Sequence, residues 1–343
     1  RNQSHSNHHF RWTDPMSTAL EFYSQSDLLS RTNVRAGEQR LGETLQIVDE
    51  ATFNGTEAFD QRFIIVGVEE DFGVRANHGR GGADQAFQAF LSHFCNLQNN
   101  RFFPSQEVAV LGAVVPTQSV DDGDIEGLRS ATSAADGLIS TIVERIISGG
   151  AVPIIIGGGH NNSYGCLTGA AKAGGAAVNC LNIDAHTDLR NLEGRHSGNG
   201  FSYAKSEGSL GAYFMWGLQE NYTPEYIWQF MEDHDEIEYL SYEDGLAGEE
   251  SMEETLVRIE ELLGSNYAIE LDVDVIAEFP SSAQSISGFS LEQVRKMIYS
   301  LDTNPTYFHL CEGRIASADD AARAGRGLAL LVADFIKAFI FQE

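Results

Sequence analysis

Short apolar runs of four to six residues recur along the chain from residue 62 onward, each bounded by polar or glycine-containing segments. Runs of this length, rich in Val, Ile and Tyr, are typical of buried β-strands. The pattern predicts eight strands, at Phe63–Val68, Val108–Gly112, Pro153–Ile156, Val178–Ile183, Tyr213–Leu218, Ile237–Leu240, Tyr267–Leu271 and Tyr307–Leu310.

Between these runs, apolar residues recur at helical spacing, most clearly from about Asp124 to Ser148, where Gly149 and Gly150 end the pattern. Further helices are expected at Asp84–Leu97, Asn162–Ala173, Thr223–Glu232, Ser251–Leu263, Leu291–Leu301 and Gly327–Phe341. Strands that alternate with helices indicate an α/β fold, with a mostly parallel sheet covered on both faces. In such folds, ligands bind beyond the carboxyl ends of the strands.

The chain shows no Pro/Gly/Ser-rich linker and no internal repeat. We therefore interpret residues 61–343 as a single catalytic domain. Residues 1–60 have weaker periodicity, with a possible helix near Ser17 to Leu29, and are expected to form an N-terminal extension that packs on the domain.

Three potential metal ligands follow the apolar run Val178–Ile183 at alternate positions: Asp184, His186 and Asp188. Alternation places them on one side of an extended backbone, so they converge if the chain turns just after Ile183. Two carboxylates and an imidazole suit a fairly hard divalent ion, Mn²⁺ most naturally, with Zn²⁺ or Fe²⁺ as alternatives. The other interpretation is a capped loop with one hydrogen-bonded histidine.

Two more predicted strands end in possible ligands. Three glycines follow Pro153–Ile156 and allow a tight turn that brings His160 to the same point. A phosphate-binding loop is the rival interpretation, but no Lys-Ser or Lys-Thr pair follows. The strand at Tyr267–Leu271 continues into Asp272 and Asp274, which are either caps or metal ligands, and unpaired buried carboxylates are costly.

Together these segments supply four carboxylates and two imidazoles, too many ligands for one ordinary ion. They suit two ions about 3.5–4 Å apart with bridging carboxylates. Such a pair lowers the pKa of a bridging water and orients the resulting hydroxide. The predicted reaction is therefore hydrolysis at an electrophilic carbon or phosphorus.

Composition narrows the possible partners. A formal net charge of −28 argues against nucleic acid and membrane surfaces, because both would repel the chain. With only four lysines, the acidic surface suggests a host with a salty cytoplasm. The four scattered cysteines fit reduced thiols in a cytoplasmic protein, and no apolar run is long enough to span a bilayer. We assign the histidines within Arg1–Arg11 to a tail and expect a small-molecule substrate.

The motifs Gly157–His160, Asp184–Asp188 and Leu271–Asp274 resemble those of the ureohydrolase family, which includes arginase, agmatinase and formimidoylglutamase. The resemblance extends from about Arg62 to Phe341. It implies a three-layer α/β/α sandwich with an eight-stranded, mostly parallel sheet, two Mn²⁺ per subunit and a homo-oligomer. It also implies that a metal-bridging hydroxide attacks the planar carbon of a formimino or guanidino group.

The resemblance further implies which residues hold each ion. One ion would be held by His160, Asp184, Asp188 and Asp272. The other would be held by Asp184, His186, Asp272 and Asp274, with Asp184 and Asp272 as bridges. An acidic residue that pairs with the cationic amidine is also implied, and Glu312 occupies its place. The alternative for Glu312 is an ordinary salt bridge to Arg314.

The segment Arg190–Phe201 bears on the choice of substrate. Arginase and agmatinase carry a histidine directly before a glycine here, whereas this chain has Ser197 preceded by His196, a pattern similar to formimidoylglutamase. An anionic substrate such as N-formimino-L-glutamate needs cationic and polar partners, and His196 is a candidate general acid for the leaving amine. The candidate substrate-binding residues are Arg75, Arg80, Arg190, Arg195, Ser197 and Asn199. The alternative for the arginines is pairing with surface carboxylates.

Two departures from the family pattern affect specificity. The usual Asp-Pro after the last ligand pair is absent from Val275–Pro280, and the loop Ser281–Gly288 is short and serine-rich. The sequence is thus interpreted as a Mn²⁺-dependent formimidoylglutamase that yields glutamate and formamide. The alternatives are a guanidino hydrolase that releases urea, and an inactive metal-binding relative with an interaction role.

Overall fold

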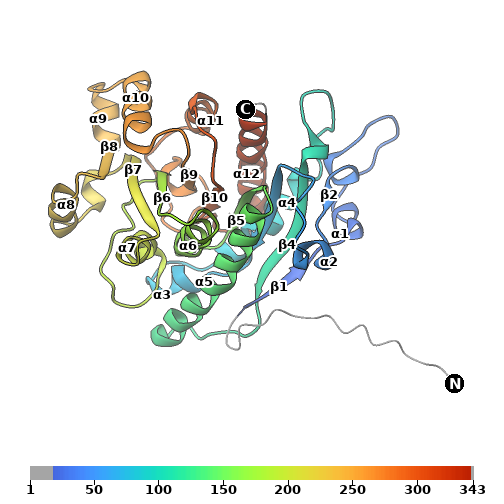
Figure 1. Cartoon of the computed structure of the whole chain (residues 1–343), viewed down its shortest axis with the longest axis horizontal. Helices are drawn as coiled ribbons and strands as arrows, with labels where there is room; N and C mark the ends of the chain where they lie inside the picture. Colours follow the sequence, from blue (N-terminus) through green and yellow to red (C-terminus); the bar gives the residue numbers. More distant parts are fainter. Residues whose placement is uncertain (1–17, 341–343) are drawn as a thin grey trace.

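The computed structural model describes residues 18–340, which fold around one mostly parallel sheet (Figure 1). In spatial order the strands run β1-β4-β3-β5-β10-β9-β6-β7-β8, and β2 pairs with β4. The strands are β1 (Thr18–Phe22), β2 (Gln46–Ile47), β3 (Phe63–Val68), β4 (Val108–Pro116), β5 (Val152–Gly157), β6 (Val178–Ile183), β7 (Leu210–Leu218), β8 (Ile237–Ser241), β9 (Ala268–Asp272) and β10 (Phe308–Cys311).

Helices cover both faces of the sheet. The helices are α1 (Gln25–Leu29), α2 (Glu50–Asn54), α3 (Phe72–Ala76), α4 (Ala86–Phe94), α5 (Ile125–Ser148), α6 (Asn162–Gly174), α7 (Gly200–Ser206), α8 (Glu225–Glu232), α9 (Tyr242–Ala247), α10 (Met252–Leu263), α11 (Leu291–Ser300) and α12 (Ala318–Phe339). Helices α5 to α8 pack on one face, and α4, α10, α11 and α12 pack on the other. A hydrophobic core lies on each face of the sheet, and successive residues of a strand pack into opposite cores. In β3, for example, Ile64 faces α5 and Ile65 faces α4.

This arrangement confirms the three-layer α/β/α sandwich, and all eight strands expected from the apolar runs are present. The predicted strand count is wrong, because the described sheet has ten strands. The additional β1 and β2 both come from the first 60 residues and both pair with β4, β1 antiparallel and β2 parallel. Both strands form by pairing with β4, which is distant in sequence, and the apolar periodicity of residues 1–60 gives no sign of that pairing.

The helix expected near Ser17 to Leu29 is correct only for its last five residues. Thr18–Phe22 forms β1 instead, with its first three residues buried against β4. Gly112 of β4 permits this close approach, since a Cβ there would lie 1.9 Å from the carbonyl oxygen of Glu21. Tertiary pairing has therefore overridden a weak local helical preference.

The strand order determines where chemistry can take place. Strands β5, β10, β9 and β6 are neighbours in the centre of the sheet and run parallel. Their carboxyl ends therefore open onto the same edge, although the segments that follow them are far apart in sequence. The histidines within Arg1–Arg11 lie outside the described residues. Between residues 18 and 340, no helix has the length and apolar character needed to cross a membrane.

Phe335 of α12 is a test of the core on the α12 face. It is 0% exposed and stacks on Phe308 with ring centroids 4.3 Å apart. We expect Phe335→Ala to lower the free energy of unfolding by about 3–5 kcal/mol, because it leaves a cavity in a packed core. Urea denaturation measures this loss. Phe102→Ala, at a side chain that is 73% exposed, is the control and should change stability by less than about 0.5 kcal/mol.

Candidate metal centre

The turn after β5 delivers His160 to the carboxyl edge of the sheet. Gly157 and Gly158 adopt φ angles of 102° and 68°, which favour glycine. A Cβ at Gly157 would lie 2.5 Å from the carbonyl oxygen of Val68, so the close approach also requires glycine. Buried Glu70 supports this turn by accepting hydrogen bonds from the side-chain amides of the two asparagines that follow His160.

The other two ligand segments leave the sheet beside this turn. After β6, the backbone N–H of His186 donates to Asp184 Oδ1 at 2.7 Å, which curls the segment back on itself. Asp188 takes a left-handed φ of 50° two residues later. After β9, the N–H of Asp274 donates to Asp272 Oδ1 at 2.8 Å. Each turn is thus closed by a carboxylate whose other oxygen, Oδ2, faces His160 Nδ1.

All six predicted ligands converge. Around His160 Nδ1 lie Asp188 Oδ2 at 2.7 Å, Asp184 Oδ2 at 3.1 Å and Asp272 Oδ2 at 3.5 Å. Around His186 Nδ1 lie Asp274 Oδ2 at 3.0 Å and Asp184 Oδ1 at 3.6 Å. The two oxygens of Asp184 face the two histidines, as a bridging carboxylate requires.

These groups fit divalent cations. Two ligands that are each about 2.1 Å from one ion lie at most about 4.2 Å apart, and the distances above meet that limit. His160 Nδ1 is buried without a hydrogen-bond partner, although carboxylates surround it. Burial, together with the charges of Asp274 and Asp184, raises the pKa of Asp272 well above its usual range. Among residues 18–340 no lysine or arginine pairs with these carboxylates, so a divalent cation would supply the compensating charge.

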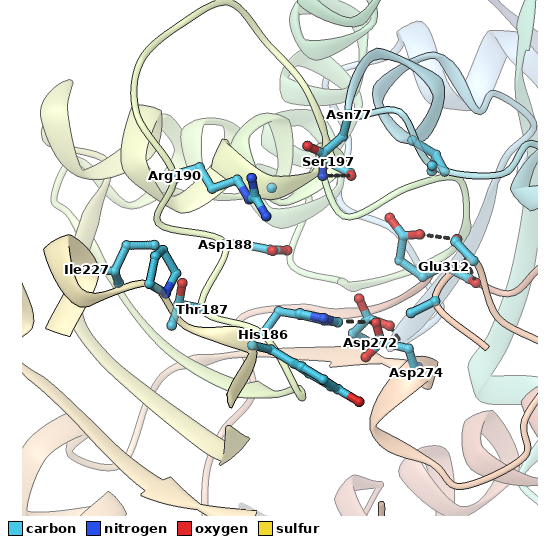
Figure 2. A pocket seen from close by; sticks show the side chains of 17 residues that line it. Asn77, His186, Thr187, Asp188, Arg190, Ser197, Ile227, Asp272, Asp274 and Glu312 are labelled. Atoms are coloured by element: carbon cyan, nitrogen blue, oxygen red, sulfur yellow. Dashed lines mark hydrogen bonds and ion pairs between the residues drawn. The ribbon is translucent and has the colours of Figure 1, made fainter. Parts of the chain in front are cut away.

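A cavity of about 180 Å³ opens onto the cluster (Figure 2). Seven of the residues singled out from the sequence line it: His186, Asp188, Arg190, Ser197, Asp272, Asp274 and Glu312. His160 and Asp184 lie buried, 1% and 0% exposed, and from within the protein they contact the lining residues Asp188 and His186, respectively. The cavity is therefore a small, polar compartment that ends at the candidate ligands.

Glu312 lies beside the ligands, following β10 in a left-handed conformation with a φ of 64°. Its Oε1 accepts from the backbone N–H of His160 at 2.8 Å, and Ser282 Oγ donates to its Oε2. Burial, then the charges of Asp274 and Asp188, raises the pKa of Glu312 to about 7. The alternative salt bridge to Arg314 is not formed, since the Arg314 Nε donates to the carbonyl oxygen of Gly81.

Arg190 is the arginine that the structure brings to the cavity. Its side chain crosses Gly198, where a Cβ would lie 2.9 Å from the Arg190 Cδ. The guanidinium reaches over the cavity on the side of Asp188 and Ser197 (Figure 2). A basic side chain therefore borders the cavity across from Glu312, which gives the compartment a cationic and an acidic side.

Arg195 and Asn199 lie away from the cavity. Arg195 is 4% exposed and donates to both carboxylate oxygens of Asp136, at 2.9 and 3.3 Å, and to the carbonyl oxygen of Asn161. Its Nη1 donates to Asn199 Oδ1 at 2.7 Å, and its guanidinium lies over the ring of Tyr164. Each of the three guanidinium nitrogens donates a hydrogen bond within the protein, so Arg195 holds its own loop in place, outside the cavity lining.

His196, Arg75 and Arg80 do not line the cavity either. His196 is 1% exposed; its Nδ1 accepts from the N–H of Gly198 and its Nε2 lies 3.2 Å from Glu193 Oε1. Arg75 forms ion pairs with Asp71 and Asp122, and Arg80 is exposed. His196 therefore lies outside the cavity lining, and its role as a general acid stays a prediction.

Several cavity residues were not foreseen. Asn77 donates from Nδ2 to Ser197 Oγ at 3.2 Å, and Tyr222 stacks on the ring of His186 with centroids 5.3 Å apart. Ser282 belongs to the serine-rich loop that marked a departure from the family pattern, so a signal for it existed. Nothing in the local sequence distinguishes Tyr222, because only the folded chain places it over His186.

A mostly parallel sheet between two helical layers, with clustered histidines and aspartates at its carboxyl edge, defines an α/β protein with a candidate metal centre. More specifically, the chain belongs to the arginase family, whose family model matches residues 61–319. This agrees with the resemblance found in the three sequence motifs.

Similarity to individual proteins is more distant. A formimidoylglutamase of Streptococcus pyogenes is 28% identical over 200 residues, which are 56% of this chain, and the match spans about half (56%) of that relative. Trypanosoma cruzi formiminoglutamase, solved with Mn²⁺, superposes with a TM-score of 0.70 at 20% identity, over 89% of this chain and 100% of that one. Proclavaminate amidino hydrolase of Streptomyces clavuligerus superposes with a TM-score of 0.67 at 18% identity, over 83% and 94%.

Asp184 is the best single test of the cluster. Because its two oxygens face both histidines, Asp184→Ala should remove metal from both halves of the cluster and abolish activity. Metal content after dialysis, measured by plasma mass spectrometry, checks this. Asp235→Ala, at an exposed carboxylate, is the control and should keep its metal. Full metal content and turnover in Asp184→Ala would refute the assignment.

His196 generates a prediction for stability. Burial lowers the pKa of His196 from 6.5 to about 4, against a partial opposing effect of Glu193. Between these two pH values the unfolded chain binds a proton that the folded chain does not, so stability falls as the pH falls from 6.5 to 4. His196→Gln should show a shallower fall over the same window. Urea midpoints at stepped pH measure both slopes, and equal slopes would contradict the assignment.

Proposed function

We propose that this chain is a Mn²⁺-dependent formimidoylglutamase, which hydrolyses N-formimino-L-glutamate to L-glutamate and formamide. The observation that carries the proposal is the polarity of the cavity: Glu312 lies on one side beside the metal ligands, and Arg190 borders the other. A substrate with a cationic amidine at one end and carboxylates at the other matches this polarity. The named relatives support the same substrate class.

The donor set suits two Mn²⁺ ions held by the residues given above, with Asp184 as a bridge. When bound, such a pair lowers the pKa of a water molecule and supplies a nucleophile near neutral pH. The chain's own residues would then orient the substrate. Glu312 accepts from the planar N–H groups of the amidine, because its carboxylate lies at the ligand cluster and is held by Ser282 and the His160 backbone.

Arg190 would bind a carboxylate of the glutamate portion, with Asn77 and Ser197 as neutral hydrogen-bonding neighbours. The cavity of about 180 Å³ has room for a small substrate. The size and polarity therefore favour a small zwitterionic substrate over a large or purely cationic one.

A guanidino hydrolase that releases urea is the alternative function. The specific observation in its favour is again Glu312, because a guanidinium presents the same planar N–H groups as an amidine. Arg190 argues against agmatine, which lacks a carboxylate. An inactive metal-binding relative is the second alternative, and it predicts bound metal without turnover. We further propose that the protein is cytoplasmic, because its four cysteines are buried and unpaired. We also propose a homo-oligomer, on the resemblance to the family, and sedimentation velocity tests it.

The deciding experiment is a substrate panel with Mn²⁺-loaded protein. Formamide from N-formimino-L-glutamate, without urea from arginine, agmatine or guanidino acids, is the expected result. Urea formation in preference to formamide would establish the guanidino alternative. Bound Mn²⁺ with neither product would overturn the enzyme proposal.

Arg190 tests the substrate orientation. Arg190→Gln removes a charged hydrogen bond to the substrate, so we expect the KM for N-formimino-L-glutamate to rise about 10- to 100-fold. The kcat should change less, because the metal ligands are unaffected. Arg101→Gln, at an exposed arginine distant from the cavity lining, is the matched control. An unchanged KM in Arg190→Gln would contradict the proposed contact.

A further inference from the structure

A row of polar side chains lies buried beneath the metal ligands. Asn182 of β6, Glu270 of β9 and His309 of β10 occupy the same register across three neighbouring strands. All three are 0% exposed. Glu270 lies two residues before Asp272, and Asn182 lies two before Asp184, so each points to the same face as a ligand, one pleat lower. We call these three residues the polar row.

The polar row contacts the ligands from below. Asn182 Nδ2 donates to Asp184 Oδ2 at 3.0 Å, which orients that carboxylate. Glu270 Oε2 lies 3.5 Å from His160 Nε2. The polar row therefore contacts two candidate ligands: Asp184, which follows β6, and His160, in the turn after β5.

Glu270 itself is held firmly. Its Oε1 accepts from the hydroxyl of Tyr307 at 2.6 Å, and its Oε2 lies 2.6 Å from His309 Nδ1. A buried carboxylate is costly unless such donors satisfy it. Among the residues that the structure describes, no lysine or arginine pairs with Glu270, so its Oε1 is directed at Tyr307 and its Oε2 at His160 and His309.

The two nitrogens of His160 face different surroundings. Nδ1 faces the oxygens of Asp184, Asp188 and Asp272, whereas Nε2 faces Glu270. A neutral imidazole has one N–H and one lone pair. To bind a cation at Nδ1, the ring must carry its proton on Nε2, and Glu270 is the acceptor that faces this position.

We propose that Glu270 is a positioning residue that holds His160 as its Nε2–H tautomer and thereby sets the metal affinity of the half of the cluster that contains His160. Carboxylates that accept from a metal-bound histidine typically affect affinity in this way. Tyr307 and His309 act through Glu270 by fixing its orientation. The proposal rests on the metal centre of the proposed function and does not depend on the identity of the substrate.

Glu270→Gln is the test, because glutamine keeps the shape of the side chain but replaces one acceptor oxygen with a donor NH₂. Without substrate, Mn²⁺ affinity in a chelator-competition titration should fall about 10- to 100-fold at the weakened half of the cluster. The His186 half should keep its ion, so that a single-ion electron paramagnetic resonance signal replaces that of a coupled pair. Tyr307→Phe keeps the carboxylate but removes one of the groups that fix its orientation, so it should lose less affinity than Glu270→Gln.

A tautomer measurement provides the second readout, which a merely structural role would not change. In Zn²⁺-loaded protein, ¹⁵N–¹H correlation of the His160 ring should show a proton on Nε2 in the wild type and an altered ring signature in Glu270→Gln. Wild-type affinity in Glu270→Gln, or a wild-type proton on Nδ1, would overturn the proposal. If Glu270→Gln does not fold, the wild-type tautomer still decides. Neither readout involves substrate, so a failure of the proposed hydrolysis would be a separate result.

Discussion

The structure depends on a concentration of negative charge that the protein itself does not neutralise. Four aspartates and two histidines meet at one edge of the sheet, mostly buried, and the aspartates repel one another. Removing an ionised carboxylate from water is costly unless a cation compensates. Hydrogen bonds from the surrounding groups keep the candidate ligands close together despite the repulsion between the carboxylates.

Three features of the fold hold these side chains together. Parallel strands in the order β5, β10, β9 and β6 bring separate chain segments to one edge. Carboxylates that accept their own turn's N–H groups fix the local geometry, as Asp184 and Asp272 do. Glu70 and Glu312 hold the His160 turn from two sides. The candidate ligands are therefore preorganised by the whole sheet edge, which no single motif contains.

The arginines show how similar side chains take different roles. In a chain with a net charge of −28, basic residues are few, so those near a site are candidates for binding an anionic substrate. Arg190 lines the cavity, but Arg195, only five residues later, is buried against Asp136 and two tyrosine rings. A buried, fully bonded guanidinium stabilises a loop, whereas one at a cavity is available to a ligand. Burial and partners decide the role, and sequence proximity does not.

The sequence alone determined the eight central strands, the layered α/β class and the six candidate metal ligands that the structure brings together, because buried parallel strands are continuous apolar runs and their chemistry follows directly at their ends. It did not determine β1 and β2, the substrate-facing residues, or the places of His196 and Arg195. These depend on contacts between segments distant in the chain: β1 pairs with β4, Tyr222 stacks on His186, and Asp136 of α5 captures Arg195. Periodicity reports local environment, and only the tertiary structure selects partners across the fold.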